Sequence, residues 1–329
     1  MSQAFDVIVV GYGLSGAISA IEAHDAGAKV LLIEKEPFPG GISICAGGGA
    51  RIADDAGKAF EYLKASNAGT TPDAVLQRLA HELVALPGYV KKLCEPLGAT
   101  ATTNNTKGNY ALPGYETWGY VRVLDVPGFD PKAAYPHVRA EGEVEGLNMF
   151  KVAQEHVKKR DIKVRLNSPV RRLHWEDGEV RGIVCDETFE ARRAVILATG
   201  GFESSEDLQQ QFWPTPPVRA VATFGNTGDG IRMAQQVGAG LWHMWHYHGV
   251  YGFHHPDPEF RLGIRIRRMR NWVPGSTSQH DNPMSWIVVD QRGERFMNEY
   301  DPYMQDTNHR PMALYDPITQ NYPRIPSVL

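Results

Sequence analysis

The chain has 329 residues, of which 42% are hydrophobic and 22% charged, as in globular proteins large enough to bury a core. Its formal net charge of -4 excludes a strongly basic protein that binds nucleic acid through its overall charge. The sequence contains neither an apolar run of roughly 18 residues nor a signal-peptide pattern at its N-terminus, so we expect a cytoplasmic protein without a membrane span.

The first elements form a βαβ unit. Residues Phe5 to Val10 are a nearly continuous apolar run that ends in glycine, which predicts a buried parallel strand. Apolar residues at helical spacing follow from Leu14 to Ala26, and Lys29 to Ile33 is a second apolar strand.

A GxGxxG motif joins the first strand to the helix, and Glu34 ends the second strand. In this context the glycines let a pyrophosphate approach the helix N-terminus, and a carboxylate about twenty residues on can bind ribose hydroxyls. The alternative is a tight turn followed by a solvated strand end. An acidic residue also disfavours the 2′-phosphate of NADP, which leaves FAD and NAD.

A second glycine-rich loop, from Lys35 to Ala50, separates these two cofactors. A plain NAD dehydrogenase usually enters its next helix at once, whereas this loop brings many backbone N–H groups toward a longer dinucleotide. The sequence therefore predicts FAD. The predicted cofactor-binding residues of this first part are Gly11, Gly13, Leu14, Ser15, Gly16, Glu34, Lys35, Gly41, Ser43, Gly48 and Gly49.

The middle of the chain mixes a long helix with irregular sequence. Residues Pro72 to Leu97 predict a helix interrupted near Pro87, and Ala99 to Pro136 is rich in Gly, Pro, Asn and Tyr, which predicts an irregular excursion. A further amphipathic helix is predicted from Gly146 to Arg160.

Short strands are predicted after this helix. They cover Ile162 to Leu166, Val170 to Trp175 and Val180 to Cys185, with a hairpin turn at Asp177-Gly178. Residues Ala194 to Ala198 predict one more buried strand before Thr199-Gly200-Gly201.

Five blocks of sequence in order resemble the FAD-binding domain of the fumarate reductase and succinate dehydrogenase flavoprotein family, which includes 3-ketosteroid dehydrogenases and urocanate reductases. The blocks are VVGYGLSGAISAIEAHDAGAKVLLIEK, GGISICAGGG, AVILATGGF, NTGDGIRMAQQVGA and GERFMNEY. The resemblance covers most of the chain. It implies that Val170 meets the adenine, that Ala198, Thr199 and Gly200 line the dinucleotide, and that Asp229 lies beside the flavin.

The glycine-rich loop departs from the family's commoner GGN-S/T pattern, because Ile42 replaces the asparagine. Membrane-bound members tether their flavin through a histidine in this loop. No histidine lies between Ile33 and Ala50, so the resemblance implies non-covalent FAD.

The resemblance implies an α/β fold with two parts. Residues 1–240 are expected to form a Rossmann-like FAD-binding domain with a parallel sheet and a β-meander. From Leu241 the sequence becomes rich in aromatic residues, histidine and arginine, so residues 241–329 are expected to form a partial α+β capping domain that holds the substrate.

Candidate catalytic residues fall in this second part. Tyr303 occupies the place of the proton-donating arginine of fumarate reductases, which favours a ketosteroid-like or enone substrate; the alternative is an aromatic residue packed near Pro302. His248 and Arg268 are weaker candidates, for carbonyl binding and proton relay. The simpler interpretation places this histidine in a polar loop and this arginine on a solvated surface.

No metal site is predicted. The histidines after residue 242 have no repeated spacing on a clear helix, and Cys45, Cys94 and Cys185 form no CxxC pair. Isolated thiols fit a reducing compartment, and we interpret the three cysteines as small core residues.

The sequence therefore predicts an FAD-dependent oxidoreductase that transfers a hydride between flavin and a carbon–carbon bond beside a carbonyl or carboxylate of a small-molecule substrate. Two alternatives stay open: a catalytically incomplete flavin-binding subunit or redox sensor, and an NAD-dependent dehydrogenase. Nothing after Tyr300 resembles the family's glycine-rich return to the flavin, so we expect either a truncated gene product or a partner that completes the flavin site. Apolar surface left exposed in this way favours a homo-oligomer. The substrate and the reaction direction are not specified.

Overall fold

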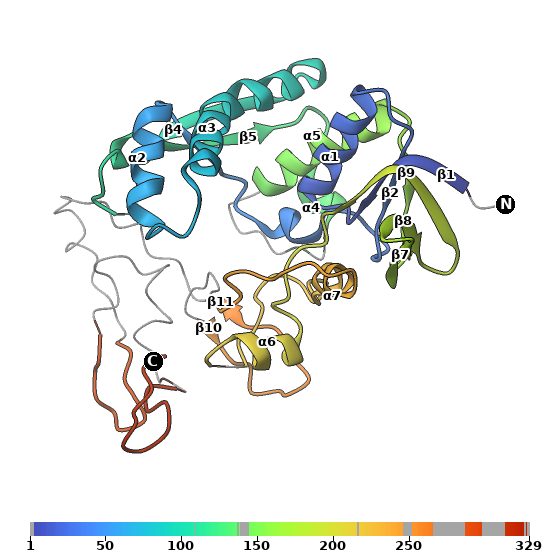
Figure 1. The fold of residues 1–329 in the computed structure, drawn as a ribbon. Helices are drawn as coiled ribbons and strands as arrows, with labels where there is room; N and C mark the ends of the chain where they lie inside the picture. The colour runs from blue at the N-terminus through green and yellow to red at the C-terminus, as the bar shows by residue number, and fades with distance from the viewer. Residues whose placement is uncertain are drawn as a thin grey trace.

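The computed structural model describes residues 3–108, 110–136, 138, 145–215, 217–245, 252–265, 287–297, 313–325 and 327. Its main sheet has six strands in the order β6-β2-β1-β9-β8-β7 (Figure 1). These strands are β1 (Gln3–Val10), β2 (Val30–Ile33), β6 (Lys163–Arg165), β7 (Arg172–Glu176), β8 (Glu179–Val184) and β9 (Thr188–Leu197). Strands β6, β2, β1 and β9 pair in parallel, and β9, β8 and β7 form an antiparallel meander. The predicted fold class is confirmed.

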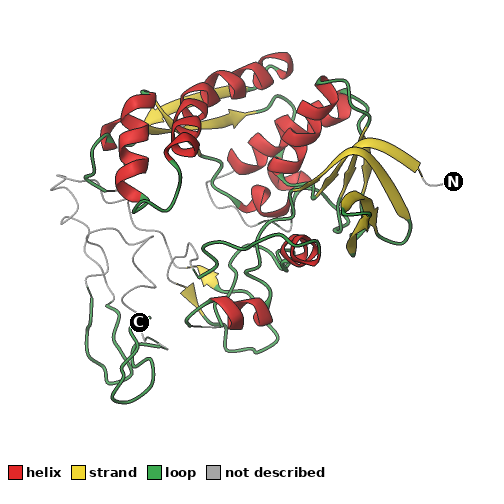
Figure 2. Ribbon diagram, in the orientation of Figure 1, coloured by secondary structure: helices red, strands yellow, loops and turns green. Residues whose placement is uncertain are grey.

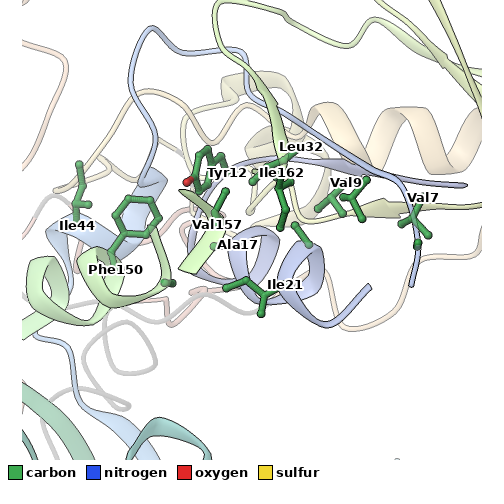
Figure 3. Packing of buried hydrophobic residues seen from close by; sticks show 14 of the residues in the cluster. Val7, Val9, Tyr12, Ala17, Ile21, Leu32, Ile44, Phe150, Val157 and Ile162 are labelled. Atoms are coloured by element: carbon green, nitrogen blue, oxygen red, sulfur yellow. The ribbon is translucent and has the colours of Figure 1, made fainter. Parts of the chain in front are cut away.

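Alternate side chains of β1 enter two separate cores, as expected for a strand covered on both faces. Val7 and Val9 pack with α1 (Leu14–Asp25) and α5 (Glu145–Lys159), which lie side by side over the sheet (Figure 3). Ile8 and Val10 point the other way, toward the meander and α7 (Asp229–Gln236). This double coverage fixes the carboxyl ends of β1, β2 and β9 at one edge of the sheet.

A second sheet occupies much of the region predicted to be irregular, so that prediction was wrong in part. Its strands are β3 (Ala50–Ala53), β5 (Trp118–Asp125) and β4 (Thr100–Asn105), all antiparallel (Figure 2). Val121 and Val123 are fully buried and alternate with Arg122, which is half-buried. This alternation is a strand pattern, but the glycine- and asparagine-rich surroundings obscure it.

The predicted interruption near Pro87 does not occur. Helix α3 runs without a break from Asp73 to Cys94 with Pro87 inside it. Proline removes one helical N–H and costs about 3 kcal/mol in an isolated helix. The buried face of α3 near its C-terminal end, which includes Val90 and Leu93, packs on the second sheet and offsets that cost.

The hairpin predicted at Asp177-Gly178 joins β7 to β8. Both residues have positive φ, at 50° and 80°. Two residues with positive φ make a type I′ turn, whose twist matches that of the flanking strands.

The remaining helices and strands are short. They are α2 (Ala56–Ser66), α4 (Pro131–Ala134), α6 (Glu206–Phe212), the 3-10 helices η1 (Gly41–Cys45), η2 (Glu95–Leu97) and η3 (Tyr115–Thr117), and the hairpin of β10 (Gly252–Phe253) and β11 (Ile264–Arg265). The domain boundary at residue 241 stays a prediction.

No helix among the described residues is both long and apolar enough to cross a membrane. Cys94 and Cys185 are buried, but Cys45 is exposed, so its interpretation as a core residue was wrong.

Candidate dinucleotide site

A crevice of about 520 Å³ opens at the carboxyl ends of β1, β2 and β9. In an open α/β sheet this edge is where ligands bind, and the volume is typical of a cofactor site. Most of the predicted cofactor residues line it: Gly11, Gly13, Leu14, Ser15, Glu34, Lys35, Gly41, Ser43, Val170, Ala198, Thr199, Gly200 and Asp229. Segments far apart in the sequence therefore meet at this crevice.

The three glycines of the GxGxxG motif have different structural roles. A Cβ at Gly11, where φ is +102°, would lie 2.3 Å from the carbonyl oxygen of Ala198, and a Cβ at Gly16 would lie 1.8 Å from the carbonyl oxygen of Gly11. These two glycines allow β1, β9 and α1 to pack closely. Gly13 differs, because its Cβ would meet nothing closer than the Ser43 hydroxyl at 3.5 Å. Its missing side chain leaves space in the crevice wall, and a pyrophosphate fits this space.

The N-terminus of α1 supplies donors beside this space. Gly13 is the N-cap and offers no side-chain acceptor, and the first turn contains no acidic residue. The amides of this turn have no partners within the helix, and the helix dipole adds positive potential. Ser43 accepts a hydrogen bond from the Leu14 amide at 3.0 Å, so its hydroxyl fixes the glycine-rich loop against the helix. The donor set suits a diphosphate.

Glu34 is buried, and backbone amides hold its carboxylate in place. Oε2 accepts a hydrogen bond from the Tyr12 amide at 2.7 Å, and Oε1 accepts one from the Glu36 amide at 3.0 Å. Burial raises the pKa of the Tyr12 phenol well above its ordinary value, so this ring stays neutral where it packs against Phe150. The carboxylate is thus oriented before any ribose binds.

Lys35 and Asp229 meet across the crevice. Lys35 Nζ donates to Asp229 Oδ2 at 2.7 Å and to Thr227 Oγ1 at 2.8 Å, and the Thr227 hydroxyl donates to Asp229 Oδ1 at 2.9 Å. This network joins the end of β2 to the first turn of α7. Both residues were predicted as cofactor ligands, and their contact with each other was not.

We predict that Lys35→Met loosens FAD retention without unfolding the protein. The ion pair is partly exposed, so its loss costs about 1 kcal/mol or less after solvent screening, which corresponds to an increase of up to about fivefold in the FAD dissociation rate. Stopped-flow release of FAD measures this rate. Lys64→Met removes an exposed ion pair with Asp73 and is the matched control. An unchanged rate in Lys35→Met would remove the network from cofactor retention.

Three predicted residues lie outside the crevice lining. Gly16 lies beneath Gly11, as described above. A Cβ at Gly48 would lie 2.2 Å from the backbone of Glu145, and one at Gly49 would lie 3.0 Å from the Tyr120 ring. The structure assigns these glycines to close packing, and their contact with the cofactor stays a prediction.

The predicted catalytic residues Tyr303, Arg268 and His248 lie outside the described residues.

Several residues that line the crevice were not predicted from the sequence as cofactor-binding residues. Asn226 is buried, and its Nδ2 donates a hydrogen bond to Glu203 Oε1 at 2.6 Å. Its Oδ1 packs closely on Gly200, where an added Cβ would lie only 2.3 Å from this oxygen. This position begins one of the resembling blocks, which was its only signal. Phe38, Ser168 and Phe224 also line the crevice. No local pattern marks them, since they arrive there through tertiary folding.

Comparison with known families decides between the two dinucleotides. The sequence matches the protein-family model described as FAD binding domain over residues 6–309. The chain belongs to this FAD-binding family. FAD is therefore the cofactor, and the family predicted from the five sequence blocks is confirmed.

Relatives of this flavoprotein include enzymes that act on steroids and on fumarate. It is 28% identical to a 3-oxosteroid 1-dehydrogenase of Mycolicibacterium smegmatis over 93% of this chain and 64% of the relative. It is 27% identical to a fumarate reductase (cytochrome) of Shewanella frigidimarina over 89% of this chain and 48% of the relative. The chain thus spans about half to two thirds of the length of these relatives.

The fold agrees with that of a solved relative. The structure of 3-ketosteroid delta1-dehydrogenase from Sterolibacterium denitrificans superimposes with a TM-score of 0.75 at 24% identity, covering 95% of this chain and 66% of that chain. Among the described residues, no group of three or more His, Cys, Asp or Glu side chains is arranged to hold a metal ion.

Proposed function

We propose that this flavoprotein catalyses hydride transfer between non-covalently bound FAD and a carbon–carbon bond next to a carbonyl or carboxylate. The observation that carries this proposal is the crevice at the sheet edge, with the open position at Gly13, the fixed carboxylate of Glu34 and the amides of α1. The names of its relatives support the reaction class, because oxosteroid dehydrogenases and fumarate reductases both act on such bonds.

The roles of the chain's own residues follow from this placement. The amides of α1 hold the diphosphate, and Glu34 binds the adenosine ribose. Bound FAD supplies the hydride acceptor or donor. The protein must orient the substrate, stabilise enolate-like charge and move one proton. We assign the proton transfer to Tyr303, with Arg268 and His248 as weaker candidates.

Among possible substrates, we favour a ketone or an enone over a dicarboxylate. Tyr303 stands at the position where the resembling fumarate reductases have their proton-donating arginine. A phenol near a ketone can exchange a proton with the carbon next to the carbonyl or stabilise its enolate. The loop from Lys35 to Ala50 has no histidine, which supports non-covalent FAD.

The function is tested with purified protein in two steps. Heat denaturation should release free FAD, which establishes non-covalent binding. Anaerobic reduction with dithionite, followed by addition of 4-androstene-3,17-dione or cyclohex-2-enone, should then restore the oxidised flavin spectrum. Protein that takes up no FAD contradicts the proposal at its first step.

A catalytically incomplete flavin-binding protein is the second candidate, because the crevice accounts for FAD binding alone. Such a protein would release FAD on heating in the same way. Its reduced flavin, however, would not be reoxidised by any enone or unsaturated carboxylate. Reoxidation therefore separates the two functions.

We predict that Tyr303→Phe slows turnover of enones by about 100-fold or more, within the range for loss of a general acid or base, and leaves the FAD content unchanged. The substitution removes the phenolic hydroxyl and keeps the ring. Stopped-flow absorbance of flavin reoxidation measures the chemical step. The control is Tyr315→Phe, a described tyrosine that packs on Tyr322. An unchanged rate in Tyr303→Phe would take this residue out of the mechanism.

A further inference from the structure

Phe224 is an exposed aromatic residue in the wall of the crevice. It is 55% exposed, although it lies among the residues that line the dinucleotide site. It belongs to none of the hydrophobic cores formed by the described residues. The fold therefore does not depend on this ring, and a ligand in the crevice can cover it.

The turn that carries Phe224 packs on the segment that follows β2. A Cβ at Gly225 would lie 3.5 Å from Glu36 Oε1, so the backbone next to Phe224 lies against the Glu36 side chain. Lys35 Nζ donates a hydrogen bond to Thr227 Oγ1 at 2.8 Å. These two contacts hold the turn beside the carboxyl end of β2.

The segment after β2 also marks the adenosine end of the crevice. Glu34 supplies the ribose carboxylate, and its carbonyl accepts a hydrogen bond from the Ser168 amide at 2.9 Å. Ser168 and Val170, the predicted adenine contact, line the same crevice. Phe224 therefore lies at the adenosine end. Ile42, another exposed apolar residue of the lining, belongs instead to the glycine-rich loop at the N-terminus of α1, on the diphosphate side.

Hydrogen bonds fix the backbone around Phe224. The Gly225 amide donates to Thr223 Oγ1 at 3.0 Å, and the Ser204 hydroxyl donates to the Thr223 carbonyl at 2.9 Å. Phe224 also lines a second hollow, but its volume is about 30 Å³, which is room for about two water molecules. A nucleotide base can therefore reach Phe224 only from the crevice.

We propose that Phe224 is an adenine-binding residue, whose ring stacks on the adenine of FAD and covers the adenosine end of the crevice. An aromatic ring suits this task because every base presents a flat π-face on which such a ring can stack. The proposal rests on the proposed function, which places the adenosine at Glu34. It means that the site selects an adenine nucleotide through the base as well as through the ribose and the diphosphate.

The test compares FAD, ADP and inorganic pyrophosphate, of which only pyrophosphate lacks adenine. FAD-loaded protein is titrated with ADP or pyrophosphate as competitor, and free FAD is measured in the ultrafiltrate, which yields the three dissociation constants. In Phe224→Ala, affinity for FAD and for ADP should fall by at least about fivefold, the lower limit for loss of a base–aromatic contact. Affinity for pyrophosphate should stay within about twofold, because this ligand has no base to stack.

Two further variants separate stacking from simple apolar contact. Phe224→Tyr keeps the flat ring and should keep the affinity for ADP within about twofold of wild type. Phe224→Leu keeps an apolar side chain without a ring, and it should lose affinity for ADP as Phe224→Ala does. Phe260→Ala is the matched control, because Phe260 is also exposed but is absent from the lining of the crevice.

Each outcome decides the proposal. Unchanged affinity for ADP in Phe224→Ala, or full affinity in Phe224→Leu, would overturn it. A parallel loss of pyrophosphate affinity in Phe224→Ala would also overturn it, since the substitution would then have distorted the whole crevice. Protein that binds ADP as expected but whose reduced flavin is reoxidised by no enone contradicts the proposed reaction and supports the adenine contact. Protein that takes up neither FAD nor ADP contradicts both.

Discussion

Gly13→Val will give a folded protein that contains no FAD. The backbone at residue 13 is extended, with φ at -82° and ψ at -172°, which any residue can adopt. A Cβ there stays 3.5 Å from its nearest neighbour, so the apoprotein tolerates it. The branched side chain fills the space where the pyrophosphate must approach the amides of α1. We expect FAD affinity to fall by at least about 100-fold, from steric exclusion combined with loss of the helix N-terminal contacts.

The matched control is Gly16→Ala. This substitution adds a smaller side chain than Gly13→Val, but we expect it to destabilise the fold, which Gly13→Val leaves intact. Its Cβ would lie 1.8 Å from the carbonyl oxygen of Gly11, where only a backbone movement can relieve the clash. We expect the free energy of unfolding to fall by about 3 kcal/mol or more, because α1 must move off β1. Urea unfolding and the absorbance of retained flavin separate the two variants. A Gly13→Val protein with stoichiometric FAD would contradict the placement of the pyrophosphate.

The first βαβ unit was predictable because its signals are local. A strand, a glycine turn, a helix and an acidic strand end follow one another within residues 5–34, and each has a recognisable residue pattern. The crevice also depends on pieces that arrive from far along the chain, such as Val170 and Asp229. Those residues were placed through the family resemblance alone, since nothing in their local pattern marks a nucleotide contact.

The fold predictions that were wrong considered local residue types without the tertiary contacts that these residues make. The strand β4 has the sequence TATTNN, in which no residue is buried, and only pairing with β5 makes it a strand. Pro87 was taken as a helix break, whereas packing of α3 on the second sheet keeps the helix continuous.

Glu34→Gln will weaken both FAD binding and the apoprotein, because the carboxylate is an acceptor for the protein as well as for the ribose. Each carboxylate oxygen of Glu34 accepts a hydrogen bond from one backbone amide, that of Tyr12 or Glu36. Glutamine keeps one oxygen and places an NH2 group against the other amide, so one buried donor loses its acceptor. The free energy of unfolding should fall by about 1 to 3 kcal/mol. Loss of the charged ribose acceptor should also weaken FAD binding by about tenfold or more.

Glu36→Gln separates these effects from a general loss of negative charge. Glu36 also lines the crevice, two residues further along the chain. Its backbone amide, rather than its side chain, makes the hydrogen bond to Glu34, so the substitution keeps that contact. Thermal unfolding of apoprotein and fluorescence titration with FAD should therefore show a large change in Glu34→Gln and a small one in Glu36→Gln. Equal changes in the two variants would mean that the electrostatic potential of the crevice, and not the oriented carboxylate, selects the ribose.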